Sequence, residues 1–300
     1  MNPSEYYVQQ SPITDPKKYA YLFDDLPQDI SGICRALQGL IFPIDAEELY
    51  GYTIPEDRRR EVDTRYVEKI LSRIIELDDR PLSEPRPPEK RFVGCCRDFV
   101  VLFCAVERHR GIPARGRIGF APYIRDFGPN FIVCHIVAEY WDSNEKRWRL
   151  VDPEQDELII TLNNIQFDPT DIPRGQFIVA GLAWQMCRAH KADPDSFGEL
   201  PDSFLKGSWF IRKNLVLDLA FLNRMELLLW DSWGDLTAPE PEPSKEQLTL
   251  LDEVATLTQA GSEAFERMRA IYEGEAVLKV PSVITCYSFV TEPTQVELAI

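Results

Sequence analysis

Cys96 stands where a loop enters a helix, in the run Gly94-Cys95-Cys96-Arg97-Asp98. At a helix start the backbone N–H groups lack helical partners and the helix dipole is positive, and both features favour a thiolate. A thiolate is the nucleophilic form of cysteine, which makes Cys96 a candidate catalytic nucleophile. The competing interpretations are that Cys96 merely packs against the core, or that Cys95 holds the nucleophilic role.

His135 is the candidate base, and the sequence offers only two other histidines, His109 and His190. Those two lie among charged residues, where a solvated ring is expected. His135 instead lies in the strand-like run 131–141, which is mostly apolar. Burying an unpaired polar ring is costly, so His135 should have a partner.

Asp152 is the partner that a simple hairpin would supply. If Ser143 and Asn144 are the two turn residues, Asp142 pairs with Glu145, and His135 then faces Asp152 directly. Cβ atoms of directly opposed residues lie roughly 4.5–5.5 Å apart. From there a carboxylate can accept the imidazole N–H and stabilise the charged ring. A β-bulge would change this register, and a purely structural His–Asp pair is the alternative.

A nucleophile, a base and an orienting carboxylate in this chain order resemble the transglutaminase-like superfamily, whose layout is related to that of papain-like enzymes. The resemblance covers residues 91–154 and rests on four segments in matching order, 94–99, 110–115, 135–141 and 148–153. It implies a catalytic triad of Cys96, His135 and Asp152, with Cys95 at the variable place of a Gly-x-Cys pattern. The helical parts on either side resemble a bacterial cytoplasmic branch of the superfamily.

Acyl transfer through a tetrahedral intermediate also requires donors for the oxyanion. The backbone N–H of Cys96 can be one, and the likeness to papain-like enzymes implies a side chain upstream of the nucleophile as another. Gln38 is a candidate for that donor, with an exposed helix glutamine as the alternative. Arg115, on the strand after the Cys96 helix, is a candidate substrate contact, with a surface ion pair as the alternative.

Metal and disulfide chemistry are the weaker interpretations of the seven cysteines. The sequence has no Cys-x-x-Cys pair, and a Cys/His/Asp set would give zinc three ligands with no evident fourth. An odd cysteine count without a secretion signal argues against a disulfide scaffold. We therefore expect no bound metal and no cofactor.

Hydrophobic spacing predicts the elements that must position these residues. Helices are expected over 30–41, with Ser31 as N-cap, over 61–78, from Cys96 to Gly111, and over 177–190, 209–230 and 246–272. Strands are expected over 115–123, 131–141, 146–152 and 158–162, and in the tail over 280–290. This pattern predicts an α+β fold, which the resemblance specifies as a transglutaminase-like core of a helix on an antiparallel sheet with additional terminal helices. The expected parts are an N-terminal helical part (1–80), the catalytic core (81–170) and a C-terminal helical extension packed on the core (171–300).

Composition excludes several classes of partner. The 300 residues include 33 basic and 49 acidic side chains, which gives a formal net charge of −16. A nucleic acid or an anionic membrane surface would require a basic face. No apolar run approaches the roughly 18–20 residues of a membrane span, and the N-terminus lacks a signal-peptide layout, so a cytoplasmic location is expected.

The leading hypothesis is a cysteine-nucleophile acyltransferase or hydrolase. Its acyl donor would be an amide, an ester or a thioester, with a carrier-bound acyl group as one option, and its acceptor would be water or an amine. The sequence does not choose between the two acceptors. The alternative is a catalytically silent binding or assembly module that retains the fold, although a scaffold does not require all three residues of the triad.

Overall fold

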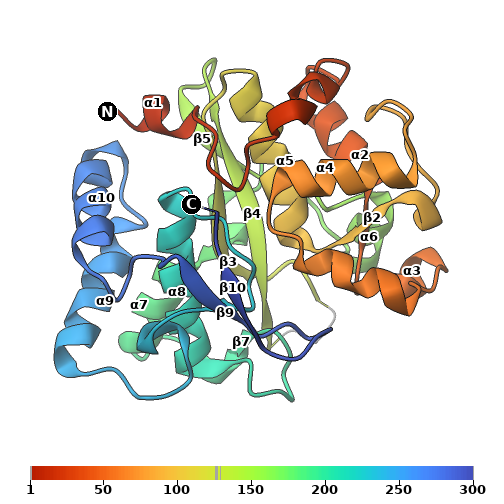
Figure 1. Ribbon diagram of the computed structural model, residues 1–300. Coiled ribbons are helices and arrows are strands. Elements are labelled where there is room, and N and C mark those ends of the chain that lie inside the picture. Colours follow the sequence, from red (N-terminus) through yellow and green to blue (C-terminus); the bar gives the residue numbers. More distant parts are fainter. Residues whose placement is uncertain (1, 126–127, 129, 300) are drawn as a thin grey trace.

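A computed structural model describes residues 2–125, 128 and 130–299, and its centre is a sheet in the order β5-β4-β3-β6 (Figure 1). The main strands are antiparallel to one another: β3 (Ala114–Ala121), β4 (Ile132–Asp142), β5 (Arg147–Val151) and β6 (Ile178–Val179). The short strand β7 (Phe197–Gly198) runs parallel to the start of β4. A separate parallel pair joins β1 (Ile41–Pro43) to β2 (Phe92–Gly94).

The two faces of the sheet have different environments because side chains alternate along a strand. On β4 the even-numbered residues, such as Cys134 and Ile136, join the main hydrophobic core. The odd-numbered Val137 joins a smaller cluster with Tyr123 and Leu150. His135 therefore shares the face of the smaller cluster, whereas its neighbour Cys134 points into the main core.

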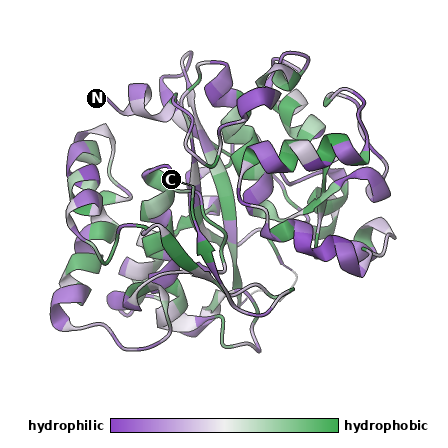
Figure 2. Ribbon diagram, viewed as in Figure 1, coloured by the Kyte–Doolittle hydropathy of each residue, from purple (hydrophilic) through white to green (hydrophobic). Residues whose placement is uncertain are grey.

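Helices flank the sheet. They are α1 (Pro3–Tyr7), α2 (Ile30–Leu40), α3 (Glu47–Tyr50), α4 (Val67–Leu77), α5 (Cys96–His109), α6 (Glu157–Asn163), α7 (Ala180–Arg188), α8 (Gly207–Leu222), α9 (Lys245–Leu257) and α10 (Phe265–Gly274). Figure 1 shows α2, α4 and α5 on one side of β4 and α7 to α10 on the other. Figure 2 shows β4 as hydrophobic over much of its length, whereas α9 and α10 alternate between hydrophilic and hydrophobic residues. That alternation is typical of helices with one buried face.

The C-terminal part contains more than helices. Strands β8 (Asp231–Ser232), β9 (Val283–Cys286) and β10 (Thr294–Glu297) form an antiparallel sheet in the order β10-β9-β8. The helix expected over 246–272 is two helices, α9 and α10. One hydrophobic core includes Leu37, Phe103 and Leu219, so residues from all three expected parts pack together, and the division at residues 80 and 170 stays a prediction.

The α+β class is confirmed, whereas the strand expected over 158–162 and the Ser31 N-cap are wrong, and the helix expected over 209–230 ends at Leu222. The run 158–162 is not a strand but lies in α6, because the side chain of Asp156 accepts the free N–H groups of Leu158 and Ile159 and caps a helix there. A short apolar run fits a strand or a buried helix equally well by periodicity alone. The N-cap of α2 is Asp29, which accepts from Gly32, and not Ser31.

Among the described residues, no helix combines the length and the apolar composition that crossing a membrane requires.

Candidate active site

Helix α5 begins at Cys96, and the residues before it explain why. Cys95 is the N-cap, and the Asp98 carboxylate accepts the Cys95 backbone N–H at 2.9 Å. A Cβ at Gly94 would lie 2.8 Å from that carboxylate and 3.0 Å from Ile41, so the close approach requires glycine. The Gly-x-Cys pattern thus fixes the helix start and places the Cys96 thiol in the first turn.

Arg97 anchors this helix start to distant parts of the chain. Its side chain is fully buried and donates to the backbone oxygen of Glu226 at 2.7 and 3.0 Å and to that of Thr64 at 3.2 Å. It also pairs with the buried Asp98 carboxylate at 3.0 Å. Since Asp98 caps the helix, the position of Cys96 depends on this buried pair.

Replacing Arg97 by methionine is expected to lower the free energy of unfolding by about 3–5 kcal/mol, because Asp98 would keep a buried charge without its partner. Urea unfolding followed by circular dichroism measures the loss. The matched control is Arg35→Met, which removes an exposed arginine from α2 and should change stability little. Equal stability of the two variants would show that Arg97 does not hold the helix start.

His135 and Asp152 are in direct contact. The Nε2 atom of His135 lies 2.7 Å from Oδ2 of Asp152, and both side chains are buried. The same Oδ2 accepts the hydroxyl of Tyr123 at 2.8 Å, and Oδ1 accepts the backbone N–H of Glu154 at 3.2 Å. Asp152 is therefore fixed from two sides, and the expectation that it reaches the His135 ring is confirmed.

The register behind that expectation is wrong by two residues. In the structure Asp142 pairs with Arg147, and Ala138 pairs with Val151 at the end of the ladder. The connection is 143–146, with Lys146 in the left-handed region at φ 53°. A shift of two preserves the face of every side chain, so Asp152 stays on the side of His135 as a diagonal neighbour.

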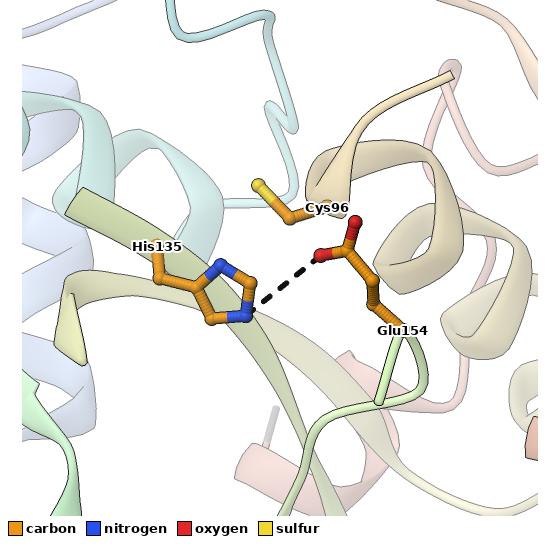
Figure 3. A group of neighbouring side chains, drawn as sticks. All are labelled: Cys96, His135 and Glu154. Atoms are coloured by element: carbon orange, nitrogen blue, oxygen red, sulfur yellow. Dashed lines mark ion pairs between the residues drawn. The ribbon is translucent and has the colours of Figure 1, made fainter. Parts of the chain in front are cut away.

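Glu154 is the site residue that the sequence reasoning missed. Its carboxylate lies 4.0 Å from Nε2 of His135, and one of its oxygens, the Cys96 sulfur and a His135 ring nitrogen all lie within 4.8 Å of one another. Figure 3 shows the Glu154 carboxylate directed toward the ring and the Cys96 side chain beside it, each on a separate element. Counting the observed pairing onward from Ala138–Val151 assigns position 154 to His135, although β5 itself ends at Val151.

The charges around the ring favour its protonated form. Burial works against a charged ring, but the Asp152 charge and hydrogen bond outweigh it and raise the pKa of His135 to about 9. The contact with Cys95 and burial raise the pKa of the Cys96 thiol well above its ordinary value. Burial also raises the pKa of Glu154 to about 8. The helix start was expected to favour a thiolate, whereas in this arrangement both the thiol and the imidazole hold their protons near neutral pH.

Alkylation of Cys96 by iodoacetamide is therefore expected to accelerate from pH 6 toward pH 9. Below the His135 pKa of about 9 the ring is an imidazolium and cannot take the thiol proton, and above it the neutral ring can. Asp152→Asn removes the charge that raises this pKa, so the rise should move to lower pH. Peptide mapping by mass spectrometry gives the rates. A rate that is flat from pH 5 to pH 9 would instead indicate a preformed thiolate.

Gln38 is not a free oxyanion donor in this structure. Its side-chain amide nitrogen donates to the backbone oxygens of Pro153 at 3.1 Å and Gln155 at 3.2 Å, which uses both of its N–H groups. Gln38 is also partly buried, so the exposed-glutamine alternative does not describe it either. It ties α2 to the segment that follows Asp152.

Arg115 lies away from the group around Cys96. On β3 it faces Glu139, whereas Gly119, four positions farther along, faces His135, a separation of about 13 Å along a strand. Its Nε atom donates to Glu139 at 2.7 Å, and its guanidinium stacks on the Trp148 ring at 4.2 Å. Arg115 therefore forms an ion pair, although a largely buried one rather than a surface pair, and its contact with substrate stays a prediction.

Comparison with known proteins finds a match to one family model. Residues 58–153 match the model of the transglutaminase-like superfamily, and this segment contains Cys96, His135 and Asp152. No curated protein matches the chain. Among solved structures, that of a provisionally assigned cysteine protease from Cytophaga hutchinsonii is similar, with 15% sequence identity and a TM-score of 0.33. The match covers 58% of this chain and 44% of that one, so it spans less than half of the bacterial protein.

Proposed function

Since residues 58–153 match the model of the transglutaminase-like superfamily, we propose that this chain is a thiol enzyme of the acyl-transfer type. The observation that carries the proposal is the position of the His135 ring. The ring is bonded to the Asp152 carboxylate at 2.7 Å on one side and has the Cys96 sulfur within 4.8 Å. A nucleophile, a base and an orienting carboxylate gathered around one ring are the parts that covalent acyl transfer requires.

In the proposed reaction the Cys96 sulfur attacks the carbonyl carbon of an amide, ester or thioester. His135 takes the thiol proton and then delivers it to the leaving group, while Asp152 holds the ring and stabilises its charge. The backbone N–H of Cys96, at the first position of α5, has no partner within the helix and is available to the oxyanion. Water or an amine then takes the acyl group from the sulfur.

A silent binding or assembly module is the second candidate. The geometry disfavours it, because a scaffold would not need a buried His135–Asp152 pair beside a partly exposed thiol. Burying such a pair costs desolvation free energy, and a binding surface gains nothing from it.

The test supplies a reactive acyl donor, p-nitrophenyl acetate, with and without methylamine as acceptor. We expect release of nitrophenol to depend on Cys96, and the ratio of acetate to N-methylacetamide to show whether water or the amine is the preferred acceptor. A protein whose nitrophenol release equals that of Cys96→Ala would be a silent module.

A further inference from the structure

The acyl-transfer proposal gives no role to Glu154, which is the third member of the group around Cys96. Sulfur, imidazole nitrogen and carboxylate oxygen from Cys96, His135 and Glu154 lie within 4.8 Å of one another (Figure 3). The three residues come from the start of α5, from β4 and from the segment after β5. Convergence of these donor types is typical of a site for zinc, which binds thiolate, imidazole and carboxylate ligands.

The distances between the three donor atoms are compatible with a zinc site if the side chains move closer together when the ion binds. Zinc bonds of about 2.0–2.3 Å in a tetrahedron place neighbouring donor atoms roughly 3.3–3.7 Å apart. The present separations are at most 4.8 Å, so on binding they would shrink by at most about 1.5 Å, through rotation of the Glu154 and Cys96 side chains. Three protein ligands would leave a fourth position for water, as in zinc sites that are not closed by protein ligands.

The surroundings of His135 fit a metal ligand as well. Its Nε2 atom is engaged by Asp152, which Tyr123 holds in turn, and this leaves Nδ1 for an ion. The Glu154 carboxylate now lies 4.0 Å from Nε2, so it would have to turn toward the Nδ1 side of the ring to bind the same ion. In metal sites a histidine ligand usually donates its other ring N–H to a carboxylate. That carboxylate fixes the tautomer and the orientation of the ring. Asp152 itself is occupied by these contacts, so Glu154 is the carboxylate that can move onto the ion.

We propose that Cys96, His135 and Glu154 form a binding site for a zinc-type divalent cation, and that the bound ion blocks the thiol. On binding, a metal–sulfur bond replaces the S–H bond of Cys96 and the proton leaves to solvent. A chelator removes the ion, and the thiol takes up a proton again. The binding site goes beyond the proposed function, while the blocking effect rests on it.

Binding is tested with Co²⁺, which gives absorption bands that report a tetrahedral site and a sulfur ligand. Chelator-treated protein should develop a near-ultraviolet sulfur-to-cobalt band together with visible bands, and Zn²⁺ should displace them. Cys96→Ser should lose the sulfur band, whereas Cys95→Ser should keep it. Absence of the band, or its loss in Cys95→Ser alone, would overturn the site.

Competition with a chromogenic chelator gives the affinity for Zn²⁺. Glu154→Gln should weaken binding by about tenfold or more, because it removes a ligand, and Asp152→Asn by about 10–100-fold, because it removes the partner of a ligand. The matched control is Glu157→Gln, which changes an exposed carboxylate on the nearby α6 and should leave the affinity unchanged. Circular dichroism checks that each variant folds. Equal affinity of Glu154→Gln and the parent would remove Glu154 from the site.

A separate experiment, acetylation of the thiol, tests whether the bound ion blocks Cys96. Zn²⁺ should stop acetylation of Cys96 by p-nitrophenyl acetate, and a chelator should restore it. A cobalt spectrum without any acetylation would leave the metal site standing and refute the acyl-transfer proposal. Acetylation without a cobalt spectrum would do the reverse.

Discussion

Replacing Cys96 by alanine is expected to lower turnover of an amide or ester substrate by at least about 10⁴-fold, because it removes the sulfur that is proposed to form the acyl-enzyme. The change removes only the sulfur, and alanine is compatible with a helix start, so the fold should survive. Turnover of the same substrate by the parent and the variant, measured under single-turnover conditions, gives the ratio.

The control for this prediction is Cys95→Ser. Cys95 caps α5, and serine is a favoured N-cap residue, so the helix should still begin at Cys96. We expect this variant to stay within about tenfold of the parent, a change of no more than about 1.4 kcal/mol in the barrier. If Cys95→Ser is inactive while Cys96→Ala turns over normally, the nucleophile is Cys95.

Asp152→Asn is expected to lower turnover by about 10³–10⁴-fold, the size seen when an orienting aspartate is lost from a triad. An amide can keep the contact but cannot stabilise an imidazolium, and it can hold the ring in the wrong tautomer. Because the Asp152 charge helps to raise the His135 pKa to about 9, the variant should also reach its plateau at lower pH. A pH–rate profile of both proteins measures the two effects together.

Two further variants serve as comparisons for Asp152→Asn. Tyr123→Phe removes the hydroxyl that donates to Asp152 but leaves the His135–Asp152 bond, so a loss of about tenfold is expected, as for a single hydrogen bond. Asp25→Asn changes an exposed carboxylate and should have no effect. An Asp152→Asn profile that matches the parent in rate and inflection would leave Asp152 a structural partner of His135.

The sequence predicted the contact between His135 and Asp152 for a reason that survives an error in register. Side chains alternate with a period of two, so any even shift of a hairpin keeps the same residues on the same face. The register follows from the length of the loop. The observed loop requires Lys146 to adopt a left-handed backbone conformation, and position 146 holds neither the glycine nor the asparagine that would predict one. The same error in register left Glu154 unnoticed. With the observed four-residue connection 143–146, counting along the pairing assigns position 154, and not position 152, to His135.

Other parts of the site could not be predicted because they depend on contacts between distant segments. The partial burial of Cys96 and its contact with Cys95, which oppose a thiolate, follow from tertiary packing rather than from the helix start. The ties of Gln38 to the segment after Asp152, and of Arg97 to Glu226, join residues more than 100 positions apart. Local periodicity carries no information about such pairs.

The most direct test of the central claim locates the acyl group. The unmodified protein is exposed briefly to p-nitrophenyl acetate at pH 9, quenched in acid, digested and mapped by mass spectrometry. We expect one acetylated cysteine, Cys96, formed at a rate that falls sharply in His135→Ala. Acetylation of another cysteine in place of Cys96, or of Cys96 at the same rate without His135, would contradict this expectation.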